Sequence, residues 1–392
     1  MNPERFRNSS AGRVIRVGQG ETAYWAFVPY PLPPRLVMDP RLVCQLSEAD
    51  RALGELAGLG RTMPNPHLLI RPFLRREAVL SSRIEGTRAE ITDLYSYEAR
   101  QLALPGFQPR ESEADVREVY NYVRALEYGL ERLKTLPVSL RLIRELHERL
   151  MEGVRGEQAT PGEFRRSQNW IGPPTCTLNE AIFVPPPVEE MHQALEAFEK
   201  YLHSADEHPP LIRLAFIHYQ FEAIHPFLGG NGRIGRLLIS LLLVNWGLLP
   251  SPLLYLSAFF ERHRDSYYDL LLKVSEPWQE WVRFFLEGVA SQSRDAIVRA
   301  KRLQDLQAEW RQRIQRERIG VLTIRLMEEL FFSPVFSPPE VAKRLRVSHQ
   351  AVMQSIRKLE QGGILQEITG RQRHRLYAAL DILSLLDERE LT

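Results

Sequence analysis

The string HPFLGGNGRIGR, residues 225–236, links two predicted helices and is the most informative stretch of the chain. Its loop glycines and asparagine permit main-chain conformations with positive φ. In such a turn, successive N–H groups converge with the N-terminus of the following helix and form an anion-binding nest. The string therefore predicts a phosphate-binding loop between two helices.

Three side chains in this string carry a charge or exchange a proton. Arg233 and Arg236 lie three residues apart on one face of the first helical turn, where guanidinium groups clamp phosphate oxygens. Cations oppose the dipole at a helix N-terminus, which indicates an anionic ligand between them. His225 precedes the nest and is placed to take a proton from a hydroxyl that attacks a bound phosphate. Each residue alone has an ordinary structural explanation, but together they favour a nucleotide site.

The composition of the chain is typical of a folded protein. Its 392 residues, 44% hydrophobic and 26% charged, predict two or three globular domains. A net charge of +2 is too balanced for a general polyanion binder. Cys44 and Cys176 provide neither a disulfide framework nor paired zinc ligands. The N-terminal residues lack the apolar core of a signal peptide, and no apolar run reaches about 18 residues, so we expect no membrane span and a cytoplasmic location.

Helical periodicity covers most of the chain. The first seventy residues are rich in proline and predict an irregular arm followed by one helix near 46–59. Further helices are predicted at 72–104 with a break near Gly86, and at 111–133, 140–151, 188–202, 211–224, 233–247, 257–274 and 278–318. Between 160 and 187 the periodicity disappears, and glycines and prolines indicate a loop and β-hairpin. We therefore expect a mainly α-helical bundle with an inserted β-hairpin.

The last seventy residues predict a winged helix-turn-helix domain, with helices near 320–332, 338–345 and 347–361 and strands near 364–368 and 374–377. Over residues 340–375, eight Lys and Arg against three Glu give a local charge of +5. The third helix would turn Val352, Ile356 and Leu359 to a core and its polar face to a major groove. The arginines of 370–375 would form a wing near phosphates. Winged helices also dock proteins, so DNA and protein are alternative partners.

The string at 225–236 resembles the signature of the Fic family, HPFx[D/E]GNGRxxR, and matches every fixed position except the acidic one. The resemblance extends upstream to PGEFRRSQNWIG, residues 161–172, which is similar to the segment leading into the family's β-hairpin flap. It covers about residues 70–290. It implies a Fic-type helical bundle with a β-hairpin flap that transfers AMP from ATP, with Mg²⁺ on the phosphates, to a Ser, Thr or Tyr hydroxyl of a target protein.

The resemblance also implies roles for individual residues. His225 would be the general base that deprotonates the target hydroxyl. Arg233 would hold the phosphates and Arg236 would take the γ-phosphate. The phosphate cradle would comprise Gly230, Asn231 and Gly232; the flap edge over the nucleotide would comprise Asn169, Trp170, Ile171 and Gly172; and Tyr268 would flank the adenine. For the flap and Tyr268, hairpin structure and core packing are equally good explanations.

Gly229 stands where the family has Asp or Glu, the residue that the resemblance implies for binding Mg²⁺. Glycine offers no side-chain oxygen to a hard cation. Mg²⁺ or Mn²⁺ would then arrive with the phosphates of ATP and be held less firmly. Because His225 and the phosphate-cradling residues remain, we expect a working enzyme rather than an inactive one.

An upstream string, SSRIEG at 81–86, resembles the family's inhibitory motif, [S/T]xxxE[G/N]. Ser81 and Glu85 are four residues apart and share one helical face. The resemblance implies that Glu85 pairs with Arg236 and so blocks productive placement of the γ-phosphate. The ordinary alternative is a solvated glutamate on a charged helix.

The sequence thus predicts four parts: an N-terminal region with the inhibitory helix (1–110), a catalytic domain (111–290), a connector helix (291–319) and the winged helix (320–392). The favoured function is an adenylyltransferase that Glu85 inhibits. The rival is an ATP-sensing, DNA-binding regulator that has lost transfer chemistry, which Gly229 favours. A third alternative keeps the fold but moves UMP, phosphocholine or phosphate, or removes AMP. A homodimer through the connector helix is compatible with the pattern.

Overall fold

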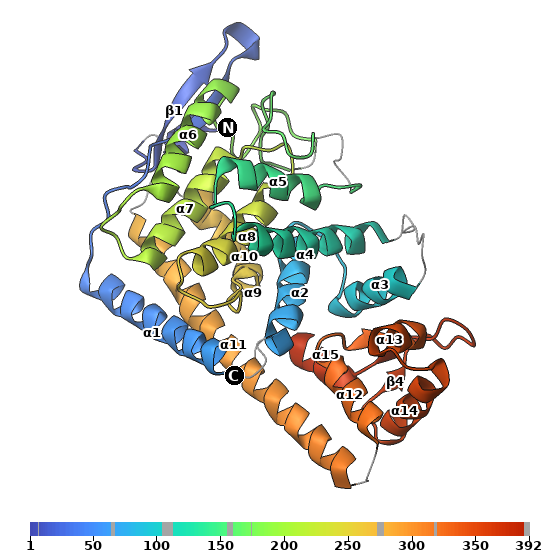
Figure 1. The fold of residues 1–392 in the computed structure, drawn as a ribbon. Helices are drawn as coiled ribbons and strands as arrows, with labels where there is room; N and C mark the ends of the chain where they lie inside the picture. The colour runs from blue at the N-terminus through green and yellow to red at the C-terminus, as the bar shows by residue number, and fades with distance from the viewer. Residues whose placement is uncertain are drawn as a thin grey trace.

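The computed structural model of the chain describes residues 1–387 except 7, 64–66, 104–112, 155–159, 174, 273–277 and 317–319. Helices dominate the fold, and the C-terminal elements lie beside the helical core (Figure 1). In the part of the chain so described, no helix is long and apolar enough to cross a membrane.

The N-terminal arm is not irregular, as the proline content had suggested. Strands β1 (Gly12–Val17) and β2 (Tyr24–Pro29) form an antiparallel hairpin, with Gly12 opposite Pro29 and Val17 opposite Tyr24. The prolines begin where β2 ends, so they bound the hairpin rather than prevent it. Phe27 of β2 packs on Phe6 and on Phe183 of the loop region, with ring centroids 5.6 and 5.7 Å apart respectively.

The long helix α1 (Pro40–Thr62) begins earlier than predicted because Asp39 caps it. The Asp39 carboxylate accepts hydrogen bonds from the N–H groups of Arg41 and Leu42, at 2.9 and 3.0 Å. Such a cap satisfies main-chain donors that the first helical turn leaves unpaired. Helix α1 then lies along the outside of the molecule against α11 (Trp278–Arg316) (Figure 1).

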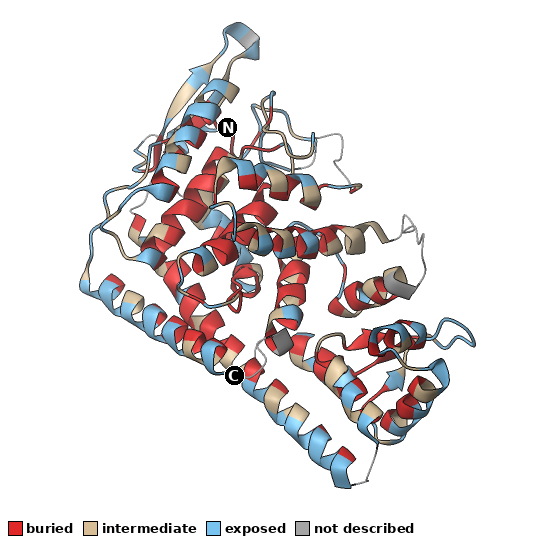
Figure 2. Cartoon of the chain, viewed as in Figure 1, coloured by how far each residue is buried: buried red, intermediate tan, exposed pale blue. Residues whose placement is uncertain are grey.

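The central bundle confirms the predicted helices. Its members are α2 (His67–Ile84), α3 (Ile91–Ala103), α4 (Ala114–Arg132), α5 (Leu140–Leu150), α6 (Val188–His203), α7 (Pro210–Ile224) and α8 (Asn231–Asn245). The predicted break near Gly86 separates α2 from α3. Helices α7 and α8 are buried along nearly their whole length, which Figure 2 shows in red. They therefore form the centre of the core and hold the loop between them in place.

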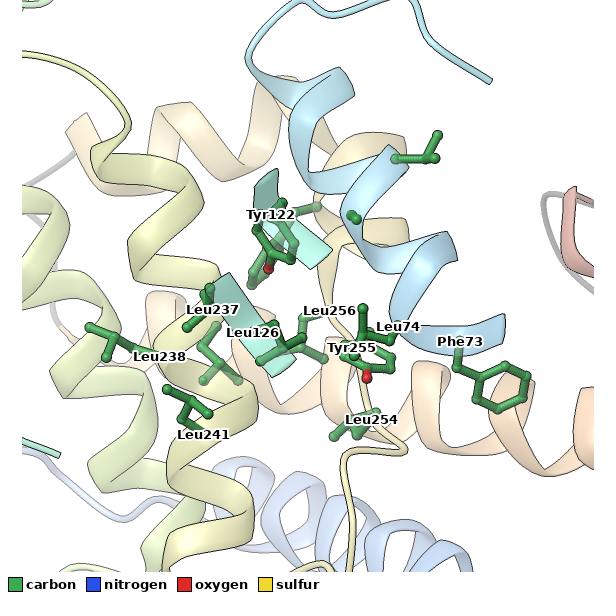
Figure 3. Close-up of a cluster of buried hydrophobic side chains, with 14 of the residues drawn as sticks. Phe73, Leu74, Tyr122, Leu126, Leu237, Leu238, Leu241, Leu254, Tyr255 and Leu256 are labelled. Atoms are coloured by element: carbon green, nitrogen blue, oxygen red, sulfur yellow. The ribbon is translucent and has the colours of Figure 1, made fainter. Parts of the chain in front are cut away.

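Side chains from several helices meet around α8 (Figure 3). Leu237 and Leu241 of α8 face Tyr122 and Leu126 of α4, and all four are fully buried. Each such side chain contributes about 1.5–3 kcal/mol through its removal from water. This packing ties α4 to the helix that starts at the glycine-rich loop.

Two predicted elements differ in detail. The helix expected over 257–274 is two helices, α9 (Ser257–Arg262) and α10 (Arg264–Leu272), because the chain bends at His263. The hairpin expected within 160–187 is mostly irregular, and one isolated antiparallel bridge joins Ile171 and Phe183. The bridge is closed by hydrogen bonds from Ile171 N to Phe183 O (2.8 Å) and from Phe183 N to Ile171 O (3.1 Å). We call residues 165–184 the flap.

The C-terminal part is a winged helix. It contains α12 (Val321–Leu330), β3 (Val335–Phe336), α13 (Pro338–Leu345), α14 (His349–Gln361), β4 (Gln366–Glu367), β5 (Tyr377–Ala378) and α15 (Leu380–Asp387). The strands form one sheet in the order β3-β5-β4. Strand β3 and helix α15, two and eight residues long, were not predicted from the sequence. Helix α15 packs back against α2, α3 and α11, so the winged helix contacts the bundle.

Candidate active site

A pocket of about 500 Å³ opens at the end of α7, where the glycine-rich loop begins. Its walls come from the flap, α7, α8, α10 and the turn after α2. Lining residues include Glu85, Trp170, Ile171, Gly172, Glu222, His225, Gly232, Arg236, Tyr267 and Tyr268. Segments far apart in the sequence therefore surround one cavity, and most of the predicted site residues line it.

The loop takes the main-chain conformations that its glycine content predicts. His225 ends α7 in the left-handed region, with φ 48° and ψ 60°. Gly230 is also left-handed, with φ 77° and ψ 6°, and it is the N-cap of α8. Left-handed residues reverse the chain between the two helices and direct the first N–H groups of α8 toward the loop.

Asn231 closes the loop with its own side chain. Its amide oxygen accepts a hydrogen bond from Phe227 N, and its amide nitrogen donates to Phe227 O, both at 2.8 Å. Asn169 of the flap donates to the same Phe227 oxygen at 2.7 Å and to His225 O at 3.3 Å. Both asparagines therefore fix the loop main chain, and Asn169 ties the flap to it.

His147 of α5, which no sequence pattern singled out, contacts the loop through Gly229 and Phe227. Its Nδ1 accepts a hydrogen bond from Gly162 N at 2.9 Å, so the proton lies on Nε2, which donates to Gly229 O at 3.0 Å. Burial lowers the pKa of His147 to about 4 and keeps it neutral. Its ring stacks on Phe227 with centroids 3.7 Å apart.

Arg165 is a second residue to which the sequence patterns assigned no role. It is fully buried, and its guanidinium donates to His225 O at 3.1 Å and also to Pro186 O. Its main-chain N–H donates to Pro226 O at 2.9 Å. The arginine thus joins the base of the flap to the start of the loop. A single arginine in an irregular segment gives no periodic signal, which is why sequence patterns did not identify it.

His225 is arranged to accept a proton. Its Nδ1 lies 3.3 Å from Glu222 O, and because a carbonyl oxygen only accepts, Nδ1 carries the hydrogen. Nε2 is then the acceptor atom of the ring. Burial lowers the pKa of His225 to about 4, so the imidazole is neutral near pH 7 and free to take up a proton.

Arg236, in the first turns of α8, is buried and held by Ser81 of α2 and by Glu85, which follows that helix. Its Nε donates to Ser81 Oγ at 2.9 Å, and one terminal nitrogen donates to Ser81 O at 3.0 Å and to Glu85 Oε1 at 2.7 Å. Burial alone would lower its pKa, but Glu85 raises it above the ordinary value. Arg236 is therefore always charged and already paired.

Glu85 follows the last residue of α2 rather than lying within the helix as predicted. Its side chain is 35% exposed, and although burial acts to raise its pKa, Arg236 holds that pKa below its usual range. The carboxylate lies against Gly232, where an added Cβ would come within 2.3 Å of Glu85 Oε1. An ionised carboxylate therefore rests on the first turn of α8.

The remaining predicted residues lie in different surroundings. Arg233 is buried and pairs with Glu118 of α4 at 3.2 Å. Trp170 (43% exposed), Ile171 (39%) and Tyr268 (37%) line the mouth of the pocket, and Tyr268 donates to Ile84 O at 3.4 Å.

Gly229 provides only its main chain to the loop. Its carbonyl oxygen is taken by His147, and its φ lies outside the left-handed region. A Cβ added there would meet Met151 Cε at 3.7 Å, an ordinary contact, so a side chain has room. In the described residues, no cluster of three His, Cys, Asp or Glu side chains could hold a metal ion. Within those residues, the side chains therefore do not form a complete metal site.

The winged helix presents a polar face to solvent. Val352, Ile356 and Leu359 of α14 are buried, as predicted. The residues on the opposite face are exposed; they are Ser348, His349, Gln350, Gln354 and Arg357. The wing arginines Arg371, Arg373 and Arg375 are exposed as well. Arg344 does not contribute free charge, because it pairs with Glu329 and Glu340 at 2.9 and 3.2 Å.

These features define a Fic-type fold with a C-terminal helix-turn-helix domain. A solved Fic family protein from Desulfovibrio desulfuricans G20 superposes with a TM-score of 0.53 at 18% identity, over 89% of this chain and 98% of that one. Residues 43–131 match the description "Fic/DOC family N-terminal" and 137–243 match "Fic/DOC family". Residues 324–380 match "HTH DNA binding domain". The chain belongs to the Fic/DOC family.

Curated relatives agree with this assignment. Protein adenylyltransferase Fic from Drosophila persimilis is 29% identical over 209 residues, which is 52% of this chain and 37% of that protein. The corresponding protein from Drosophila virilis is 29% identical over 209 residues, 52% of this chain and 39% of the relative. The chain thus spans less than half the length of these relatives.

Proposed function

We propose that the chain is a protein adenylyltransferase that transfers AMP from ATP to a Ser, Thr or Tyr hydroxyl of a target protein. The hydroxyl oxygen attacks the α-phosphorus, the bond from that phosphorus to the bridging oxygen breaks, and pyrophosphate leaves. The hydroxyl proton passes to Nε2 of His225. Relatives named protein adenylyltransferase support the class of reaction.

The observation that carries this proposal is the state of His225. A neutral imidazole whose Nδ1 donates to Glu222 O presents Nε2 as a proton acceptor at the pocket that also contains Arg236. The left-handed Gly230 places the N-terminus of α8 at the same cavity, where phosphate groups are favoured. A general base and a phosphate cradle in one pocket support phosphoryl-group transfer.

The nucleotide would enter between the flap and α10. Gly230, Asn231 and Gly232 would cradle its phosphates together with Arg233, and Tyr268 with the flap edge would flank the base. Arg236 would receive the γ-phosphate once its present partners leave.

The Glu85–Arg236 pair supports a further part of the proposal, that the enzyme rests in an inhibited state. The carboxylate and Ser81 together occupy Nε and one terminal nitrogen of the guanidinium, donors that a γ-phosphate would need. A nucleotide that binds without this contact would be misaligned for attack.

A metal ion, Mg²⁺ or Mn²⁺, would arrive with ATP and neutralise its phosphates. Since Gly229 has no carboxylate and the described residues form no metal cluster, no step of the proposed reaction is assigned to the ion. Because ATP is the substrate, we also propose a cytoplasmic location.

Label transfer from α-labelled ATP tests the proposal. The chain and a cell lysate would be incubated with Mg²⁺ and then Mn²⁺, using wild type, Glu85→Gly, and Glu85→Gly with His225→Ala. We expect Glu85→Gly to increase incorporation and the added His225→Ala to abolish it. No label in Glu85→Gly with either metal would contradict transferase activity. Label from another position of ATP, or from UTP, would indicate a different transferred group.

The second candidate is a DNA-binding regulator that senses ATP without transferring AMP. The match of 324–380 to a DNA-binding domain and the glycine at 229 favour it. Recovery of label only when Gly229→Asp is added to Glu85→Gly would support this second function. We also propose that the winged helix binds either DNA or a protein, and that the chain forms a homodimer.

A further inference from the structure

A second pocket, of about 420 Å³, lies on the other side of α2 from the active site. Arg76, Val79, Leu80 and Arg83 line it from α2, at positions that recur on one helical face. The remaining walls come from α9, from the start of α3 and from the end of α15; they are Ile91, Ala258, Glu261, Arg262, Leu386 and Asp387. The pocket therefore lies where the bundle meets the winged helix.

Two of the three arginines that line this pocket, Arg76 and Arg83, are available to a ligand. Arg83 is half-buried, and among the residues that the structure describes its guanidinium has no hydrogen-bond or ion-pair partner. The Arg76 side chain is 12% exposed, and its nearest carboxylate, Asp295, lies 3.5 Å away and is shared with Arg299 at 2.7 Å. Burial and the nearby Arg299 lower the pKa of Arg76 to about 10. An anionic group in the pocket would provide acceptors for the Arg83 guanidinium and a second carboxylate-like partner for Arg76.

Two carboxylates and Arg262 also line the pocket. Glu261 of α9 and Asp387 of α15 face the same cavity as the arginines. A bare anion would be repelled by them, whereas a ligand with both an anionic group and hydroxyl groups would satisfy both charges. Apolar contact would come from Val79, Leu80 and Ile91.

We propose that this pocket binds a small phosphate ester carrying hydroxyl groups, with its phosphate on Arg76 and Arg83 and its hydroxyls toward Glu261. This site is separate from the proposed nucleotide pocket and does not depend on transfer activity. Pockets of this volume accommodate small metabolites.

The position of α2 gives the site a consequence for the active site. Ser81 lies on the face of α2 away from Arg76 and Arg83, and Glu77 lies between the two faces. Glu77 bonds to Ser257 and Tyr122, and Ser81 bonds to Arg236. A ligand in this pocket would contact one face of α2, and the opposite face of the same helix holds Arg236 through Ser81. Ligand binding would therefore alter the position of the helix that holds Arg236. This consequence rests on the proposed function, but the binding itself does not.

Calorimetric titration of the full chain with ribose 5-phosphate, and separately with inorganic phosphate, tests the site. Arg83→Gln is the main variant, since Arg83 has no described partner to leave unpaired. Arg71→Gln is the matched control, because Arg71 lies on the same helix and is exposed. We expect Arg83→Gln to weaken ribose 5-phosphate binding about tenfold or more and Arg71→Gln to leave it unchanged.

Hydrogen exchange with the same probe locates the ligand. We expect protection at 76–83 and 258–262 that Arg83→Gln removes, separate from any protection at 225–236. Absence of protection at 76–83 at millimolar probe, or equal affinity of Arg83→Gln and wild type, would overturn the proposal. Equal affinity for inorganic phosphate and ribose 5-phosphate would contradict the proposed contact between the ligand hydroxyls and Glu261. Because binding is measured without turnover, a failed transfer assay leaves this result unaffected.

Discussion

Arg236 of α8 and Glu85, 151 residues earlier in the chain, form an ion pair with N···O 2.7 Å in which the arginine side chain is 2% exposed. Ser81 holds the same guanidinium through its side chain and its main-chain oxygen. The arginine is shielded from water, whereas the Glu85 side chain is 35% exposed, so salt screens the pair from the Glu85 side. Three acceptors from one short segment therefore hold the one arginine that the proposed reaction needs for the γ-phosphate.

Ser81→Ala should release part of the inhibition. It removes the acceptor of Arg236 Nε but keeps Ser81 O and Glu85, so two of the three acceptors remain. At about 1.5–3 kcal/mol for a hydrogen bond to a charged group, label transfer should rise about 10- to 150-fold. We expect label transfer to increase in the order wild type, Ser81→Ala, Glu85→Gly. If Ser81→Ala transfers no more label than wild type while Glu85→Gly is active, Ser81 does not contribute to the proposed inhibited state.

Gly229→Asp should strengthen metal-dependent binding of ATP without unfolding the chain. The added Cβ meets Met151 Cε at 3.7 Å, and the main chain there is not left-handed. We expect a melting temperature within about 2 °C of wild type and a lower Mg²⁺ concentration for half-maximal transfer in the Glu85→Gly background. Gly229→Asn is the control, because it has similar size and no charge. An equal effect of both variants would attribute the change to packing rather than to metal affinity.

His147→Phe should destabilise the loop while keeping the stacking on Phe227. It leaves Gly162 N and Gly229 O without their partner, at a cost of about 1–3 kcal/mol of unfolding free energy. Urea denaturation measures this loss. His147→Gln, which can still bond to one of the two groups, should lose less. A stability for His147→Phe equal to wild type would show that water replaces both bonds.

The folding stability of Glu222→Gln should depend on pH differently from that of wild type. Burial raises the pKa of Glu222 to about 8, and Arg236 only partly opposes this. The unfolded carboxyl releases its proton near pH 4.5, whereas the folded one keeps it until about pH 8. The folded state thus binds more protons in this interval, and its stability falls as pH rises. Glu222→Gln lacks this loss, so its stability relative to wild type should increase from pH 4.5 to 8.

Thermal unfolding of both proteins across that interval measures the difference. A constant difference in stability would contradict a protonated Glu222 in the folded chain. Glu222→Asp is a control that keeps the titration but moves the carboxyl.

Replacement of the three wing arginines by glutamine tests DNA contact. Arg371, Arg373 and Arg375 are exposed. If they neutralise phosphates, the slope of log K against log salt should become shallower by about 0.9 for each phosphate that is no longer neutralised. Arg344→Gln is the control, since Arg344 is already paired within the domain. Fluorescence anisotropy with a duplex oligonucleotide gives the slopes, and an unchanged slope would favour a protein partner.

The sequence predicted those parts of the fold that depend on periodic patterns. The helices from 67 to 245 and the winged helix follow from apolar spacing, and the loop at 225–236 follows from its glycines. His147 and Arg165 were not predicted, because each is a single polar residue whose role arises only when α5 and the flap meet the loop. The β1–β2 hairpin was missed because the neighbouring prolines dominated the pattern.

Glu85 illustrates a different limit. Its family pattern identified the residue, but helical spacing placed it inside α2, whereas the helix ends at Ile84 and Gly86 follows with φ 98°. The carboxylate still contacts Arg236, because the turn directs it toward α8. The family resemblance therefore gave the partner correctly, whereas helical spacing gave the local conformation incorrectly.

Gly232 provides the space in which Glu85 lies, since a methyl group there would come within 2.3 Å of its carboxylate oxygen. The same missing methyl group is what would let phosphate oxygens approach the first turn of α8. A side chain at 232 would therefore displace the Glu85 carboxylate and narrow the proposed phosphate site together. A substitution that separates the Glu85 contact from the proposed phosphate site must therefore be made at Ser81 or Glu85 rather than at Gly232.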